Sequence, residues 1–117
     1  MKNYRELIVW QKAMSLVKEV YKIAHLLPKE EVYALSDQMR RSAVSVPSNI
    51  AEGFGRDSAR EYAHFLSIAK GSLYELDTQI RLALMLGFIT NEQSQTAISL
   101  DDECCRMLTA MIRKLTN

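Results

Sequence analysis

The sequence predicts an all-α fold: an antiparallel up-down-up-down four-helix bundle, formed by one domain over residues 1–117. Apolar side chains recur at alternating spacings of three and four residues, which is the period of an amphipathic helix. Turn and capping signals separate four such segments. The length of 117 residues is that of a single domain. We therefore expect helices over about 4–27, 31–53, 59–86 and 91–115.

The first predicted helix carries two parallel apolar seams. One consists of Leu7, Trp10, Met14, Val17, Tyr21 and Ala24, and the other of Val9, Ala13, Leu16, Val20, Ile23 and Leu27. At about 100° per residue the two seams cover roughly 200° of the helix surface. That width exceeds what one core-facing stripe needs. We expect this helix to pack against another subunit as well as against the core.

Two proline residues affect the second predicted helix: Pro28 precedes it and Pro47 lies inside it. Pro28 closes the first helix or opens the next turn, so the second helix begins between Lys29 and Ser36. Its apolar positions keep a helical spacing on both sides of Pro47; they are Leu35, Met39, Ala43, Val46 and Ile50. Because proline lacks an amide hydrogen and usually kinks a helix, we expect a continuous helix with a kink at Pro47.

Capping signals delimit the third and fourth helices. Ser58 with Glu61, and Thr90 with Gln93, match the capping-box pattern. Gly53 and Gly55 fit a helix end and a turn, and Gly87 fits the position just beyond the third helix. The predicted core positions are Tyr62, Leu66, Ala69, Leu73, Leu76, Ile80 and Ala83, then Ala97, Leu100, Cys104, Met107, Met111 and Leu115.

Charge and composition narrow the classes of partner. The net charge is +1, so no global field draws the chain onto nucleic acid or an anionic membrane. The first 27 residues nevertheless hold five cationic and only two acidic side chains. A local basic surface must come from the first helix, and the candidate nucleic-acid contacts are Arg5, Lys12, Lys18 and Lys22. A solvated face is the simpler interpretation of those charges.

Other sequence features predict a cytoplasmic protein without a cofactor, metal or membrane partner. The N-terminus offers no apolar signal-peptide region, and the run from Leu82 to Ile89 is too short to span a bilayer. The adjacent Cys104 and Cys105 have neither zinc-site spacing nor a favourable geometry for a disulfide. We interpret them as small hydrophobic residues in a reducing compartment.

Two patterns suggest chemistry only weakly. Glu61-x-x-His64 resembles half of a di-iron site, but no second half is present. Arg60 and His64 resemble the Arg…His pair of helical-bundle ribonucleases of the HEPN class, with a spacing one residue too short. A non-enzymatic protein is therefore expected, and a helical-bundle ribonuclease remains a minor alternative.

The stretch from Ser45 to Arg56 breaks the ordinary rules of helix composition. It combines a proline, small polar residues, a carboxylate and two glycines. Neighbouring antiparallel helices would bring its polar groups near the third helix, and buried charges must be paired there. We predict a structural polar network that sets helix register or a subunit contact. Its residues are Ser45, Pro47, Asn49, Glu52, Gly53, Arg56, Ser72 and Glu75.

Several segments together resemble a known bacterial family. They are LIVWQKA at 7–13, LPKEE at 27–31, QMRRSA at 38–43, SVPSNIAEG at 45–53 and FLxIAxGSLxEL at 65–76. They are similar to four-helix-bundle proteins named after reading frames in intervening sequences of large-subunit ribosomal RNA genes. The accessory variability protein of diversity-generating retroelements is a relative.

The resemblance implies a ring-like homopentamer and no catalysis. The retroelement relative is strongly basic and binds nucleic acid and a reverse transcriptase, whereas this chain has a net charge of +1. We expect a non-enzymatic oligomeric scaffold that binds structured RNA, other nucleic acid or a nucleic-acid-processing protein. The alternative is a protein-binding adaptor with no nucleic-acid role.

Overall fold

Four α-helices make up most of the computed structural model, which describes residues 2–117. They are α1 (Ile8–Leu26), α2 (Leu35–Phe54), α3 (Ala59–Met85) and α4 (Asn91–Thr116). Two short 3₁₀ turns, η1 (Tyr4–Glu6) and η2 (Lys29–Glu31), precede α1 and α2. Residues 2–117 contain no strand, and the predicted all-α, four-helix class is confirmed.

The first helix begins later than residue 4, where the sequence pattern placed its start. Tyr4–Glu6 form η1, and Leu7 is extended and buried before α1 begins at Ile8. At the other end, Leu27 is also extended, with φ −69° and ψ 155°. Because the ring of Pro28 disfavours helical backbone in the residue before it, α1 stops one residue short of the predicted end.

The second helix begins at Leu35, inside the predicted window from Lys29 to Ser36 but later than the estimate near residue 31. Pro28 opens η2, and Glu30 and Glu31 lie in this turn. The side chain of Glu31 then accepts a hydrogen bond from the Leu35 amide at 3.4 Å. This carboxylate satisfies one of the backbone donors that the start of a helix leaves free.

The predicted boundaries of α3 and α4 are correct to within one residue. The Ser58 hydroxyl accepts the Glu61 amide at 3.1 Å, and Thr90 and Gln93 form the complete reciprocal capping box. Gly87 ends α3 with φ 77°, a backbone conformation that favours glycine. The amide of Phe88 bonds the Ala83 carbonyl at 2.9 Å, which completes the expected C-terminal motif.

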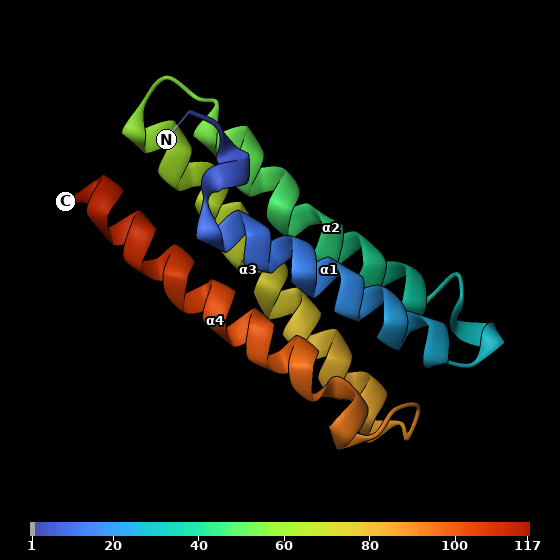
Figure 1. Cartoon of the computed structure of the whole chain (residues 1–117). Helices are drawn as coiled ribbons and strands as arrows, with labels where there is room; N and C mark the ends of the chain where they lie inside the picture. Colours follow the sequence, from blue (N-terminus) through green and yellow to red (C-terminus); the bar gives the residue numbers. More distant parts are fainter. Residues whose placement is uncertain (1) are drawn as a thin grey trace.

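Each helix packs against two others: α1 and α3 both contact α2 and α4. Contacts across α2 and α3 run in opposite numerical order, since Ser45 meets Ser72 whereas Gly53 meets Phe65. These two helices therefore point in opposite directions. In Figure 1 the chain reverses at each loop, so both termini lie at the same end of the bundle. The molecule is elongated, with extents of 43 × 23 × 20 Å.

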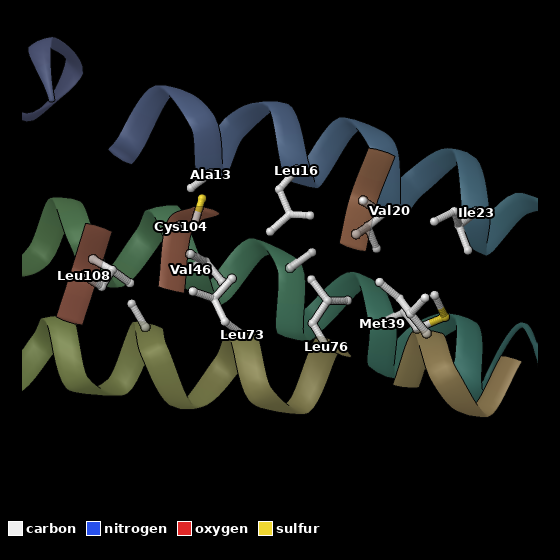
Figure 2. Close-up of a cluster of buried hydrophobic side chains, with 14 of the residues drawn as sticks. Ala13, Leu16, Val20, Ile23, Met39, Val46, Leu73, Leu76, Cys104 and Leu108 are labelled. Atoms are coloured by element: carbon white, nitrogen blue, oxygen red, sulfur yellow. The ribbon is translucent and has the colours of Figure 1, made fainter. Parts of the chain in front are cut away.

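The core follows the predicted seams of α1, α2 and α3 closely (Figure 2). On α1 it is the second seam that is buried; Ala13, Leu16 and Val20 have no exposed surface. The fully buried side chains of α2 and α3 are Met39, Ala43, Val46, Ile50, Leu66, Ala69, Leu73, Leu76, Ile80 and Ala83. Burial of this apolar surface, at about 25 cal/mol per Å², is the main stabilising contribution.

The predicted inward face of α4 is partly wrong. Leu100 and Met107 are only half-buried, whereas Asp101 and Leu108 point inward beside Ala97 and Cys104. A stripe chosen for apolar residues avoids an aspartate, but helix geometry places residues 97, 101, 104 and 108 on one face. Asp101 is therefore buried because of how the four helices pack, and the apolar pattern of α4 alone does not predict it.

Candidate interaction surfaces

Three residues of the predicted polar network meet between α2 and α3. The Asn49 amide group donates to the Ser45 carbonyl oxygen at 2.8 Å and to the Ser45 hydroxyl at 2.9 Å. The Ser72 hydroxyl donates to the same Ser45 oxygen at 2.9 Å. Ser45 and Ser72, 27 positions apart, are thus joined, and this one hydrogen bond between the two helices requires a fixed register.

Gly53 lies on the same side of α2, two turns beyond Ser45. A Cβ atom at this position would lie 2.8 Å from the Phe65 Cβ and 3.1 Å from the Tyr62 carbonyl oxygen. Real Cβ atoms do not approach so closely, so the absence of a side chain at Gly53 permits the contact with α3. Ser45 and Gly53 are therefore positions at which α2 contacts α3 directly, and Asn49 supports Ser45 from within α2.

Pro47 is buried within α2, which continues through it to Phe54. The Ser48 hydroxyl donates to the Val44 carbonyl at 2.8 Å, next to the backbone donor that proline lacks. Such side-chain bonds to a preceding carbonyl are common where a helix is perturbed. The kink at Pro47 stays a prediction.

The charged members of the motif lie at the surface. Glu52 pairs with Arg56, which lies just beyond the end of α2, with 3.1 Å between Oε2 and Nη2. Arg56 also lies over the Phe65 ring at 4.7 Å and near Glu61 at 3.9 Å. Glu75 is exposed on α3. The buried pairing of a glutamate with an arginine of the adjacent helix is not formed, because neither carboxylate points into the contact.

The bundle buries Leu7 and Ala24 at the two ends of the first apolar seam but leaves the four side chains between them uncovered. Met14 is 46% exposed and Tyr21 is 47% exposed, and Trp10 and Val17 are only half-buried. Together with α2 these side chains form a groove of about 400 Å³, here called the α1/α2 groove. It is lined by Tyr4, Trp10, Met14, Val17, Val44, Pro47, Ser48 and Ala51. A second hollow, which shares Val44, extends it past Tyr21 to Arg40 and Arg41.

The four predicted nucleic-acid contacts do not form one cluster of free cations. Lys12 pairs with Glu103 of α4, and Lys22 pairs with Glu19 at 3.1 Å. Lys18 is exposed on α1, and the guanidinium of Arg5 lies 5.5 Å from the Tyr4 ring centre. Among residues 2–117, Lys18 and Arg5 have no carboxylate within 4 Å.

The residues behind the weaker chemical hypotheses are spread over the surface and the core. Arg60, Glu61 and His64 are exposed at the start of α3. Across residues 2–117, no cluster of three or more His, Cys, Asp or Glu side chains has an arrangement that could hold a metal ion. Cys104 is fully buried and Cys105 half-buried, and both are free thiols.

Asp101 is a buried ionisable group that the sequence pattern did not indicate. It is 4% exposed, and its Oδ2 atom has no hydrogen-bond partner. Burial, with the negative charges of Asp77 and Asp102, raises the pKa of Asp101 to about 7, while Arg81 acts in the opposite direction. The only feature of the sequence that could have indicated its burial is its position next to Leu100, in the predicted apolar stripe of α4.

Comparisons with known proteins identify the family. The model of the 23S rRNA-intervening sequence protein family matches residues 5–110, and the chain belongs to this family. A crystal structure from Bacteroides thetaiotaomicron VPI-5482, of a protein with unknown function from the S23 ribosomal protein family, has the same fold. The TM-score is 0.84 at 22% identity, over 91% of this chain and 99% of that one. No curated protein matches the sequence.

One membrane-related expectation can be compared directly with the helices. Over residues 2–117, none of them combines the length and the apolar character that a bilayer crossing requires.

Proposed function

We propose that this member of the 23S rRNA-intervening sequence protein family is a non-enzymatic, homo-oligomeric scaffold. The observation that supports the proposal is the uncovered α1/α2 groove. Trp10, Met14, Val17 and Tyr21 continue a regular heptad seam, yet the bundle leaves them partly in water. A contiguous apolar surface of this kind on a small domain is typical of an interaction site.

A second copy of the chain is the occupant that accounts for this surface most simply. The outer face of α4 is polar, with no large hydrophobic residue exposed in the described part of the chain, whereas α1, α2 and α3 each expose some. The uncovered apolar surface is therefore concentrated on particular helices, as subunit assembly requires. The family resemblance of the SVPSNIAEG motif indicates five copies in a ring.

The test is the mass of the protein in solution. Sedimentation velocity of the wild-type chain should give an assembly several times the 13.4 kDa chain mass, five times if it is a pentamer. Met14→Glu, which places a charge in the α1/α2 groove, should dissociate it. Ala110→Glu on the exposed face of α4 is the matched control and should leave the mass unchanged. A wild-type chain that sediments as a monomer at all concentrations would refute the proposal.

Nucleic-acid binding is a second part of the proposal. Its support is the pair of unpaired cations Arg5 and Lys18, which a homo-oligomer would repeat in every copy. Binding through phosphate contacts weakens steeply as salt rises. We expect structured ribosomal RNA to shift in a gel at low salt, to shift less at physiological salt, and to shift less with Lys18→Ala than with Lys114→Ala.

The alternatives give different results in the same experiments. If RNA does not bind at low salt, the nucleic-acid part is wrong, and a protein-binding adaptor remains. A nuclease-treated pull-down that still recovers a protein partner favours that adaptor. If metal-independent RNA cleavage survives purification and is lost in His64→Ala, the protein is instead a helical-bundle ribonuclease.

A further inference from the structure

The outer face of α3 carries a second regular seam that the bundle does not use. Its residues follow a 3-4-3-4-3 spacing and are all exposed: Ile68, Gly71, Glu75, Thr78, Leu82 and Met85, here called the α3 stripe. Ile68 and Leu82 are each 39% exposed, and Met85 is 74% exposed. Such spacing is that of a helix whose stripe packs against another helix.

Gly71 lies within this stripe, where the protomer gives no reason for a glycine. Its backbone is helical and continuous, and a Cβ atom added there would meet nothing within 4 Å. Glycine in the middle of a helix is less favourable than alanine. Gly53 shows the opposite case, because its missing side chain is required by the contact with Phe65. A close approach by a second molecule would account for Gly71 in the same way.

The α3 stripe and the α1/α2 groove lie at matching heights along the bundle. The hydrogen bond between Ser72 and Ser45 places Gly71 at the level of Val46 and Pro47, and Pro47 lines the groove with Met14. Glu75 lies one turn further along α3, in the direction in which α2 runs back towards Arg40.

The two surfaces also carry opposite charges that the protomer leaves unpaired. Glu75 is exposed, and no cationic group of residues 2–117 lies within 4 Å of its carboxylate. The Arg40 guanidinium lies 5.7 Å from the Tyr21 ring centre, at the edge of the groove, and has no carboxylate within 4 Å in the same range. Arg41 at the same edge is already paired with Asp37, so Glu75 of the stripe and Arg40 of the groove edge are the two groups that can complement each other.

We infer that the α3 stripe of one copy occupies the α1/α2 groove of the next copy. Gly71 lies against Met14 and Pro47, and Glu75 pairs with Arg40 of the adjacent copy. Because the two surfaces are different, the contact is heterologous, and repeated contacts of this kind close into a ring where the rotation between copies divides a full turn evenly. The inference rests on the proposed homo-oligomer and specifies which faces form it.

The experiment is a charge exchange followed by sedimentation velocity. Glu75→Arg and Arg40→Glu should each weaken assembly at least tenfold, because each brings like charges together. The double variant, which restores opposite charges, should recover assembly. An equimolar mixture of the two single variants should associate more strongly than either variant alone, since each supplies a surface that the other can pair with, although a ring of five keeps at least one like-charge contact. Asp102→Arg on α4 is the control and should assemble like the wild type.

Gly71→Leu gives an independent test that does not depend on charge. The protomer has open space at this position, so the variant should keep its helical content by circular dichroism while assembly is lost. Circular dichroism thus reports on folding, and sedimentation velocity reports separately on assembly.

The outcomes separate the inference from the proposed function. If the wild type assembles and the single variants and Gly71→Leu assemble equally well, these faces are not the interface, although the scaffold proposal stands. If both single variants dissociate and neither the double variant nor the mixture recovers, the pairing of Glu75 with Arg40 is wrong. If the wild type is monomeric, the proposed function itself fails.

Discussion

The hydroxyl of Ser72 donates to the hydroxyl oxygen of Ser45, with 2.9 Å between the two atoms, and so joins α3 to α2. Asn49 donates to the same oxygen and to the Ser45 carbonyl. The polar motif in α2 therefore acts through one neutral hydrogen bond between the helices and two that hold Ser45 from within α2.

Replacing Asn49 by alanine should destabilise the protein by about 1 kcal/mol, the usual net value of a partly buried hydrogen bond. The melting temperature should fall by roughly 3–6 °C. Glu52→Ala is the matched control. Its carboxylate belongs to an exposed pair with Arg56, so the change in unfolding free energy should stay within about 0.5 kcal/mol. Equal melting temperatures for Asn49→Ala and the wild type would contradict the role of the network.

Gly53→Ala should destabilise the protein by about 1–3 kcal/mol, because the new methyl group overpacks the contact with Phe65 and Tyr62. Gly55→Ala provides the comparison. A Cβ atom at Gly55 has its nearest neighbour at 3.6 Å, an ordinary contact, and φ is −81°. That variant should unfold within about 0.5 kcal/mol of the wild type in urea. Similar losses in both variants would show that the α2/α3 approach does not depend on Gly53.

Asp101 should make the protein less stable as the pH rises. The pKa of Asp101 is raised from 3.8 to about 7 in the folded protein, chiefly by burial and then by Asp77. Between these two values the folded state binds more protons than the unfolded state, so the free energy of unfolding falls as pH increases. Below about pH 4 the carboxyl group is neutral in both states, and above pH 7 the whole cost is present. At 1.36 kcal/mol per pKa unit, the cost is at most about 4 kcal/mol.

Asp101→Asn removes this titration and should stabilise the protein at pH 8 while changing little at pH 4. Urea unfolding of both proteins at several pH values isolates the contribution, because other titrating groups cancel in the difference. Glu92→Gln, at an exposed position of α4 whose charge does not contribute to the raised pKa of Asp101, is the control and should follow the wild-type curve. A difference between wild type and Asp101→Asn that does not grow with pH would contradict the assignment.

The two adjacent thiols should react with a thiol reagent at very different rates. Cys104 is fully buried, and burial raises its pKa to about 12, so almost no thiolate is present at neutral pH. Cys105 is half-buried and should react first in the native protein. With 5,5′-dithiobis(2-nitrobenzoate), Cys105→Ala should lose the fast phase and keep a slow one that appears on unfolding in urea. A fast phase that persists in Cys105→Ala would show that Cys104 is accessible.

The apolar pattern predicted the helices and most of the core because helix period and burial are linked locally. Leu66, Leu73 and Ile80 are inward because the spacing places them on one face. The helix starts were less accurate where a 3₁₀ turn replaced the first turn of a helix. At η1 and η2, whether the chain forms a 3₁₀ turn or an α-helical turn depends on the packing of Leu7 and on Pro28. The spacing of apolar residues carries no information about either.

The polar positions were predicted less well than the core. Ser45, Asn49 and Ser72 come together as expected, because a hydroxyl or amide on the contact face is small enough to be packed and bonded there. Glu52 and Glu75 stay at the surface, since a carboxylate that can remain in water avoids the cost of desolvation. Asp101 was missed because nothing local distinguishes an aspartate that must be buried from one that is solvated.

The sequence by itself determined the four helices, the caps of α3 and α4, most core residues of α2 and α3, and the family. These follow from period, capping chemistry and a specific motif, which act over a few residues at a time. Only the tertiary structure decided which seam of α1 is covered, how closely α2 approaches α3 at Gly53, and that Asp101 is buried. Those features depend on which helix faces meet, and a pattern read along one helix does not contain the position of its neighbours.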